Sequence, residues 1–415
     1  MEKIKNIIAS QTIKDTGLSF FGLGFTALVG FIYTVIIAKY FGPNNFGIYS
    51  AIVAFMTIAF AILDLGISSA IVNFLPKNPK DRHKYLNTSF TIQLAVGVLM
   101  IFIFWLISLK PWLFIPGATS NALLISGLLG FNYVFIGFIQ GVFSAERKFF
   151  RYSLTQVIDA GLKILIIGLL IVSNKLSIEL ALLANVISTI FSFVITYFNE
   201  IPRIRIEFHK TIFDLIFHFA KWIAVNRIFS VFVSRIDVIF LNLLASSYEA
   251  GIYAAASRIT MLFSLLISSL GSVVNPRFSA FDNNEKILTY IKKLFLLVSV
   301  VCVLMLLLVL LAKPVILIVF GEKFISAVKV FQWLTVAMIP FVYTLITIPA
   351  LIYSFNQPKF VAQLTVVQVV TIVVIDLLFI PRLGALTPAL SIGISNVLVL
   401  TLSVNKLHNL FSTHE

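Results

Sequence analysis

The chain has 415 residues, of which 60% are apolar and only 12% are charged, and its mean hydropathy is +1.03. Soluble domains carry about a quarter of charged residues, so this composition excludes a water-soluble globular protein. The formal net charge of +14 would favour nucleic acid as the partner of a soluble protein, but in a membrane protein the same charge faces anionic lipid. We therefore expect an all-α polytopic membrane protein with no nucleic-acid partner.

The chain begins with a charged, loosely amphipathic segment, residues 1–17, which has no small-residue cleavage site and which we expect to lie on the cytoplasmic membrane surface. Apolar stretches of about twenty residues then recur, the length of helix that crosses about 30 Å of hydrocarbon. The sequence predicts twelve spans, at 18–38, 47–71, 86–109, 119–143, 153–173, 178–198, 221–244, 250–274, 293–312, 327–353, 361–380 and 385–405. Residues 208–220 could extend the seventh span inward, and Pro340 and Pro349 are expected to kink or break the tenth.

Lysine and arginine are shared unequally between the connections. With the N-terminus in the cytoplasm, the inside segments hold 19 of the 31 basic residues, the outside loops hold 7, and the other 5 lie within spans. The positive-inside rule then places both termini in the cytoplasm of a multi-pass protein of the plasma membrane. All connections are short, which indicates that no soluble catalytic domain is inserted between the spans.

A short stretch is repeated almost half a chain apart: "FGPNNFGIYSA" ends at Ala51 and "AGIYAA" covers residues 250–255. Shifting the first two spans by this distance places them on the seventh and eighth, so both halves would insert with the same orientation. We interpret the repeat as a duplication into two six-helix lobes around a central cavity, a transporter plan, although a chance match remains the alternative. The expected parts are 1–17, a cytoplasmic segment; 18–200, the first lobe; 201–220, a cytoplasmic linker; 221–405, the second lobe; and 406–415, a cytoplasmic tail.

The repeated residues suggest a folding role. Gly47 and Gly251 can adopt a positive φ or let two backbones approach closely. Tyr49 and Tyr253 would lie at the water interface, where an amphipathic ring is stable.

Ionisable residues inside spans cost from about 3 kcal/mol upward at the bilayer centre, so they are functional candidates. Asp159 and Lys163 are four residues apart on one helix and can neutralise each other, as a structural pair or in transport. Asp64 could line the cavity or bond to a neighbouring helix. Asp376 is expected near the outer surface, paired with Arg382.

The seventh and eighth predicted spans carry an excess of positive charge. At 1.5 Å per residue, Arg227 would lie about 9 Å and Arg235 about 21 Å from the inner end of the seventh span, with Arg258 at the depth of Arg235. Asp237 can balance only one of them, and its spacing favours Arg258 as its partner. Arginine suits phosphate oxygens, so we predict an anion-binding cavity; snorkelling to the interface is the alternative for Arg227.

Uncharged polar residues occur in other spans and could bond sugar hydroxyls or, more simply, neighbouring helices. These residues are Asn132, Gln140, Gln156, Asn185, Gln363, Gln368 and Asn396.

Four stretches carry a family resemblance: "LVGFIYTVIIAKYFGPNNFGIYSA" with "LDLGISSAIVNFLP" (28–76), "SRIDVIFLNLLASSYEAGIYAAASRI" (234–259) and "KPVILIVFGEKFISAVKVFQWL" (313–334). On these the chain resembles the O-antigen and capsule repeat-unit flippases of the multidrug/oligosaccharidyl-lipid/polysaccharide exporter superfamily. The resemblance implies two six-helix lobes, alternating access and a polyprenyl-pyrophosphate-linked oligosaccharide as substrate, with Arg235 and Arg258 at the pyrophosphate. The first two spans contain no arginine, which argues against the lipid II flippase branch.

The leading hypothesis is therefore a non-enzymatic flippase for surface polysaccharide synthesis. Its predicted headgroup-binding residues are Arg227, Arg235, Arg258 and Lys163, and its predicted cavity or coupling carboxylates are Asp64, Asp159 and Asp237. No catalytic residue, metal or cofactor is expected, coupling to H⁺ or Na⁺ is left open, and a polysaccharide polymerase and glycosyltransferases are candidate partners. The alternatives are a multidrug or cation antiporter of the same superfamily and, from a different class, a membrane polysaccharide polymerase or ligase.

Overall fold

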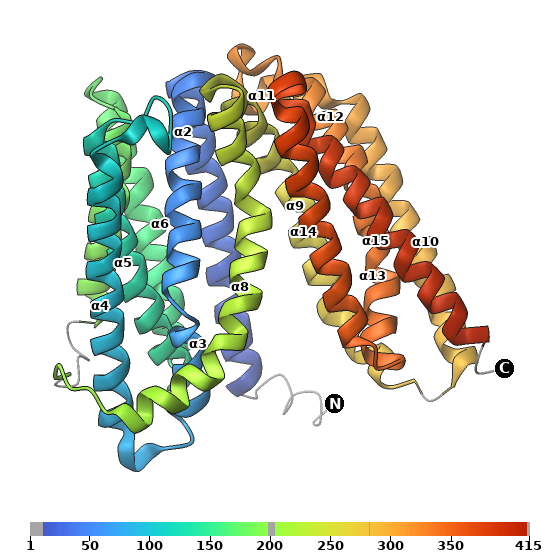
Figure 1. The fold of residues 1–415 in the computed structure, drawn as a ribbon, viewed down its shortest axis with the longest axis horizontal. Coiled ribbons are helices and arrows are strands. Elements are labelled where there is room, and N and C mark those ends of the chain that lie inside the picture. The colour runs from blue at the N-terminus through green and yellow to red at the C-terminus, as the bar shows by residue number, and fades with distance from the viewer. Residues whose placement is uncertain (1–10, 198–203, 282, 413–415) are drawn as a thin grey trace. The chain divides into compact units, whose positions relative to one another are not determined.

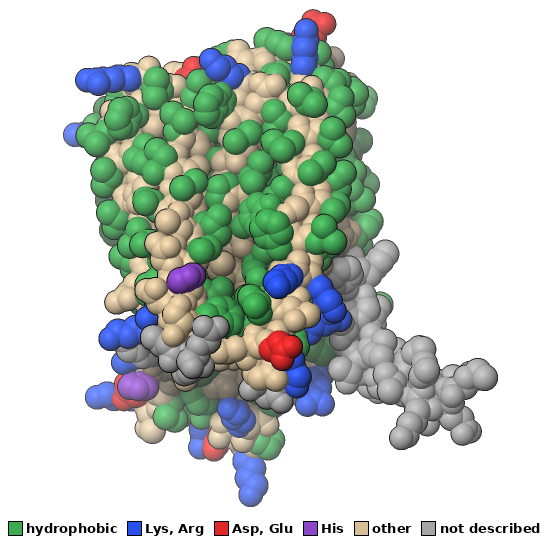
Figure 2. Space-filling model, turned by 90° about the vertical axis from the view of Figure 1, so that its right-hand side faces the viewer, with side chains coloured by type: hydrophobic (Ala, Val, Ile, Leu, Met, Phe, Trp, Pro, Cys, Tyr) green, Lys and Arg blue, Asp and Glu red, His purple; other side chains and the backbone are tan. Residues whose placement is uncertain are grey.

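The computed structural model describes residues 11–197, 204–281 and 283–412, and all regular elements within these ranges are helices (Figure 1). Of the expected segments, residues 1–10, 198–203, 282 and 413–415 lie outside the described ranges. Within the described residues, nine helical segments are long and apolar enough to cross a membrane. On the face shown in Figure 2, hydrophobic side chains cover the middle while Lys, Arg, Asp and Glu gather toward the two ends, as expected for a protein surrounded by lipid.

The count of twelve spans stays a prediction. Two of the nine segments, Gly24–Leu63 and Pro358–Ser412, have 40 and 55 residues, and each overlaps two of the expected spans. The seventh expected span lies in α8, a helix of 35 residues that begins at Lys210. Residues 210–220 are therefore helical and continuous with the expected span, and their role as a cytoplasmic linker stays a prediction.

The chain divides into two compact units, the first comprising Met1–Ile37 and Ala51–Ile236. The helices that contribute to it are α2 (Gln11–Leu63), α3 (Ile67–Phe74), α4 (Arg82–Ser108), α5 (Ser120–Ala145), α6 (Phe149–Val172), α7 (Ile178–Tyr197) and the first part of α8 (Lys210–Leu244). Helix α5 packs against α3, α4 and α7, and α7 also packs against α6. One core cluster joins α3, α4 and α5 to Ile212, Ile216 and Ala220 of α8, so the first turns of α8 are anchored in this unit.

The second unit comprises Ala38–Ser50 and Asp237–Glu415. Its helices are the end of α8, α9 (Ser247–Ser279), α10 (Asn284–Leu310), α11 (Ala312–Phe320), α12 (Ala327–Ala337), α13 (Ile339–Pro349), η4 (Ala350–Ser354), α14 (Pro358–Leu383) and α15 (Thr387–Ser412). The expected tenth span is interrupted at Met338, just before Pro340, and Pro349 precedes the π-helical turn η4, which confirms the expected break. Helices α8 and α2 each contribute to both units. The expected lobe boundaries at 200 and 221 stay a prediction.

The repeated glycines pack against each other in the second unit. A Cβ atom at Gly47 would lie 1.8 Å from the carbonyl oxygen of Ser247, and one at Gly251 would lie 1.9 Å from the carbonyl oxygen of Pro43. This confirms a close backbone approach, whereas the positive φ of 70° belongs to Gly42, where two helices merge at a kink within α2. The two copies of the motif therefore form one helix crossing.

The tyrosines of the motif do not lie at an interface with water. Tyr49 and Tyr253 are 7% and 5% exposed, and both are part of the protein core. The expectation was wrong because the close helix crossing at the glycines draws the following turns of α2 and α9 into the protein interior.

The crossing predicts that Gly251→Ala destabilises the protein, because the added methyl group would overlap the Pro43 carbonyl. Overpacking of this kind costs about 1–3 kcal/mol, and we expect a lower melting temperature for the purified protein in detergent. Gly30→Ala is the matched control, since no heavy atom lies within 4 Å of a Cβ there and alanine is the better helix former. Equal melting temperatures for the two variants would contradict the crossing.

Candidate functional site

The first unit contains a break in a membrane helix, located at Asp64. Helix α2 ends at Leu63 and α3 begins at Ile67, and between them Leu65 and Gly66 have positive φ values of 50° and 72°. Non-helical backbone at membrane depth is tolerated where it is buried in protein or lines a water-filled cavity. Interrupted helices of this kind are common at the binding sites of transporters.

Glycine at position 66 lets α8 approach this break. A Cβ atom at Gly66 would lie 2.9 Å from the carbonyl oxygen of Ala220 and 3.3 Å from the amide nitrogen of Ala224, both on α8. Arg227 follows Ala224 by three residues, so it lies on the same face of α8. The local sequence around Gly66 thus brings a guanidinium group to the broken end of α2.

Three side chains donate hydrogen bonds to the Asp64 carboxylate. Gln93 Nε2 of α4 and Ser68 Oγ of α3 lie 3.0 and 3.1 Å from Oδ1, and Arg227 Nη1 lies 2.7 Å from Oδ2. The Arg227 guanidinium also lies 4.9 Å from the centroid of the Phe60 ring, a cation–π contact. The side chain of Asp64 is fully buried and that of Arg227 is 34% exposed, so the carboxylate is stabilised by one charged and two neutral donors.

This cluster bears out one of the two alternatives for Asp64 and adds a partner, while a place in the cavity lining stays a prediction. The hydrogen bond from Gln93 confirms that Asp64 bonds to a neighbouring helix. The ion pair with Arg227 was not expected, because the two residues are 163 positions apart. It also balances the charge of Arg227, a predicted headgroup ligand; that role stays a prediction.

The pair Asp159–Lys163 forms as expected within α6. Lys163 Nζ lies 2.6 Å from Asp159 Oδ2, and Ser188 and Thr189 of α7 donate to Oδ1 at 2.9 and 3.2 Å. Lys163 also lies 5.9 Å from the centroid of the Tyr133 ring on α5. The intrahelical pairing is confirmed, and a transport role for either residue stays a prediction.

Two buried carboxyl groups meet in the second unit. Asp237 of α8 accepts a hydrogen bond from the hydroxyl group of Tyr253 on α9. The carboxyl group of Asp376 on α14 lies close to that of Asp237 and to the hydroxyl group of Ser391 on α15. Asp376 Oδ1 and Oδ2, and Asp237 Oδ1, form no hydrogen bond of standard geometry, so this cluster has unused acceptor atoms.

The position of Asp376 corrects an expectation. Asp376 is fully buried, whereas the sequence predicted an interfacial ion pair with Arg382, an exposed residue of the last turn of α14. Packing of α15 against α14, together with the neighbouring carboxyl group of Asp237, surrounds this side chain with protein. The sequence did not predict Asp376 as a partner of Asp237. The spacing of residues along one helix does not show which residues of other helices lie beside it.

Arg235 and Arg258 fall in different units. Arg235 lies on α8 two residues before Asp237, at the end of the first unit, and Arg258 lies on α9 in the second. Both side chains are half-buried. Their predicted common contact with an anion stays a prediction.

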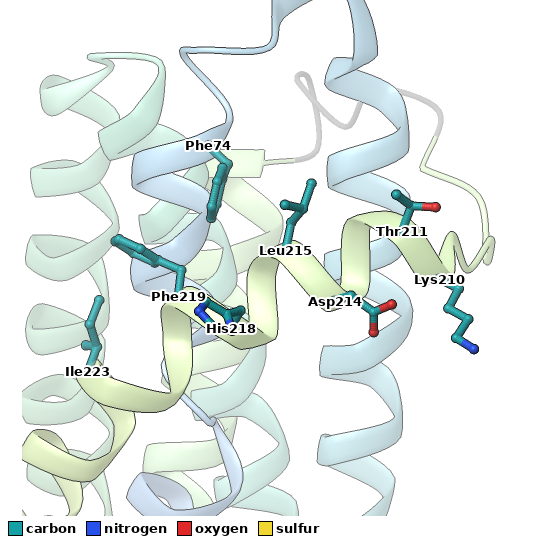
Figure 3. A pocket seen from close by; sticks show the side chains of 8 residues that line it. All are labelled: Phe74, Lys210, Thr211, Asp214, Leu215, His218, Phe219 and Ile223. Carbon is teal, nitrogen blue, oxygen red and sulfur yellow. The ribbon is translucent and has the colours of Figure 1, made fainter.

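A surface groove of about 900 Å³ follows the first turns of α8 (Figure 3). Phe74 of α3 contributes to it, and the other seven lining residues belong to α8. Its charged residues are Lys210 and Asp214, which are of opposite sign. The groove therefore offers no excess of positive charge and is a weak candidate for an anionic headgroup.

The ion pair of the first unit predicts a strong coupling between two substitutions. Arg227→Met would leave the Asp64 carboxylate buried without a cation, and we expect it to lower stability by about 1–3 kcal/mol, reduced from the value for a fully buried pair by solvent at Arg227. In the double variant Asp64→Asn/Arg227→Met the buried charge is also removed, so stability should partly return. A double-mutant cycle of melting temperatures checks this, and additive losses would contradict the pair.

Solved membrane-transporter structures share this fold. The chain superposes on an inward-facing multidrug resistance MATE family transporter of the MOP superfamily with a TM-score of 0.72, at 18% identity over 94% of this chain and 96% of the other. It superposes on the lipid II flippase MurJ in an inward closed conformation with a TM-score of 0.74, at 17% identity over 94% and 87% of the two chains. At such identities the similarity establishes the fold alone.

Sequence comparison establishes the family. A Shigella flexneri protein named "Putative O-antigen transporter" is 22% identical over 406 residues, which cover 93% of this chain and 95% of that protein. The family model for polysaccharide biosynthesis proteins matches residues 12–282, more than half of the chain. With its all-helical membrane fold, the chain is a multi-pass membrane protein that belongs to the polysaccharide biosynthesis protein family.

Proposed function

We propose that this protein is a flippase that moves a polyprenyl-diphosphate-linked oligosaccharide from the inner to the outer leaflet of the cytoplasmic membrane by alternating access. The observation that carries the proposal is the match, along 93% of the chain, to a protein named "Putative O-antigen transporter". The proposed substrate has two parts, an anionic polyprenyl diphosphate and an oligosaccharide. A transporter of this class therefore needs a site for the anionic headgroup and a site for sugars. Both termini would lie in the cytoplasm.

The arginines of α8 and α9 support a headgroup site. Arginine keeps its charge in any environment and offers paired N–H donors that match phosphate oxygens. Arg235 and Arg258 are the residues that we propose for the diphosphate, because the repeat-unit flippases that the chain resembles are expected to hold it with their central arginines. Arg227, which is paired with Asp64, would have to exchange partners to take part. Lys163, which is paired with Asp159, would have to exchange partners to take part.

The buried carboxyl groups support coupling to a cation gradient. Two carboxylates in close contact and away from water cannot both be ionised unless a cation lies with them. Asp237 and Asp376 would therefore share a proton or hold a monovalent cation during part of the transport cycle. Release of that ion on one side of the membrane would couple the gradient to translocation.

The competing functions have less support. Cationic drugs would favour an acidic site, but α8 and α9 carry more basic than acidic residues over the predicted spans. A polymerase or ligase would be expected to expose a large outside domain, and the described connections between helices are short.

The headgroup assignment predicts that Arg235→Ala or Arg258→Ala abolishes surface polysaccharide, with at least a tenfold loss. The reason is that phosphate would lose a charge-assisted hydrogen bond worth about 1.5–3 kcal/mol. Surface polysaccharide is measured in a strain that depends on this protein, with its amount in the membrane checked by immunoblotting. Arg382→Ala, at an exposed position, is the control that should keep normal levels; normal polysaccharide in both α8 and α9 variants would refute the assignment.

The coupling assignment predicts that Asp376→Asn removes the dependence of flipping on a proton or sodium gradient. An amide cannot take up a proton or balance a cation at this position. The measurement is the flipping rate of a fluorescent polyprenyl diphosphate-linked sugar in proteoliposomes, with and without an imposed gradient of each ion. Asp214→Asn, at an exposed position of α8, should behave as wild type, and an unchanged gradient effect in Asp376→Asn would exclude the carboxyl pair as the coupling site.

A further inference from the structure

The second unit contains a pocket of about 350 Å³ that is lined by α9, α13, α14 and α15. No lining residue is charged. Six of them carry hydrogen-bonding groups, namely Ser268, Asn275, Thr344, Thr365, Gln368 and Asn396. Its volume lies within the range of pockets that bind small molecules, about 300–1,000 Å³.

The polar residues of the pocket form stripes at helical spacing. On α9, Ser268, Gly271 and Asn275 follow the spacing i, i+3 and i+7, and on α14 Thr365 precedes Gln368 by three residues. Residues so spaced share one helix face. A row of hydrogen-bonding groups facing lipid tails would lack partners, so this arrangement favours a wall that faces water or a polar ligand.

Some polar side chains of this wall are held by hydrogen bonds within the protein, and others have hydrogen-bonding groups that remain unused. Gln368 Nε2 donates to Asn396 Oδ1 at 3.0 Å, and Asn396 Nδ2 donates to the carbonyl oxygen of Ala337 at 2.9 Å. These bonds orient the Gln368 amide and leave its oxygen as an acceptor. The side chains of Ser268 and Asn275 form no hydrogen bond with another described residue. The pocket thus offers oriented neutral donors and acceptors.

The other lining residues provide an apolar surface. They include Phe341, Leu345 and Pro349. A pocket whose lining combines neutral hydrogen-bonding groups with apolar groups suits a sugar ring, whose hydroxyl groups point outward and whose C–H faces are apolar. The lack of charge in the lining makes it unsuitable for a diphosphate.

We propose that this pocket binds a sugar unit of the lipid-linked oligosaccharide, while the diphosphate is held elsewhere. The inference rests on the proposed function and assigns the glycan end of the substrate to the second unit. Ser268, Asn275 and Gln368 supply the hydrogen bonds, and Phe341 supplies an apolar face. Gly271 leaves room for the ring, because a Cβ there would have only one neighbour within 4 Å, Leu345 Cδ1 at 3.8 Å.

The test compares two fluorescent probes on the full-length protein in lipid nanodiscs. One probe is a polyprenyl diphosphate that carries N-acetylglucosamine, and the other is the same polyprenyl diphosphate without a sugar. Wild type should bind the sugar-bearing probe more tightly. Asn275→Leu should weaken binding of that probe about fivefold, the equivalent of one hydrogen bond, and Gly271→Leu should weaken it at least tenfold by filling the pocket.

Both variants should bind the sugar-free probe as wild type does, and this separates loss of the pocket from loss of folding. The matched controls are Gln363→Leu, on α14 outside the pocket lining, and Gly168→Leu, at an exposed position of α6 with no heavy atom within 4 Å of a Cβ. Both controls should leave the affinities for the two probes unchanged.

Three results would overturn the inference. The first is equal affinity of wild type for the two probes, which would leave the lipid-carrier function intact and show a pocket that holds only water. The second is equal weakening of both probes in the pocket variants, which would indicate a structural effect. The third is failure of wild type to bind either probe, which would refute the proposed function as well.

Discussion

The burial of Asp64 is the constraint on which the first unit depends. An ionised carboxylate away from water must be matched by donors and, at best, by a cation. Asp64 meets this need with Gln93 from α4, Ser68 from α3 and Arg227 from α8, so three helices are tied to the broken end of a fourth. The helix break makes this arrangement possible. Gly66 adopts a positive φ, and because it has no side chain the backbone of α8 can approach it closely. A helix that continued without interruption through Asp64 would hold α8 farther away.

The second unit depends on a contact of a different kind. Gly47 and Gly251 let α2 and α9 cross at a distance that no side chain would permit. Small residues at such crossings are the usual means of bringing membrane helices together, because lipid offers no hydrophobic driving force for association. The crossing places Tyr253 in the interior, where its hydroxyl group binds Asp237. The repeated motif therefore has a structural role that leads directly to the buried carboxyl pair.

Much of the fold could be predicted from the sequence, but less of the candidate site. Span length and apolar composition are local properties, so the helical membrane class, the break of α12 and α13 near Pro340 and the pair Asp159–Lys163 followed from residues near one another in the chain. The polar residues Gln368 and Asn396 could be singled out, but not the pocket that they line. Tyr49, Tyr253 and Asp376 were placed too near the surface, because depth along a helix was used without knowledge of which face packs against protein.

The sequence by itself determined that this chain crosses the membrane repeatedly as helices, that its halves share a repeated motif, and that most of the basic residues within its spans lie in two consecutive helices. These conclusions need only hydropathy, spacing and charge. The tertiary structure alone decided that Asp64 pairs with Arg227 across 163 residues, that Asp237 meets Asp376, and that neutral polar groups from four helices line one pocket. The physical reason is that partners for buried polar groups are chosen by the rotation and crossing of helices, which depend on the packing of many side chains at once and cannot be read from any single stretch of the chain.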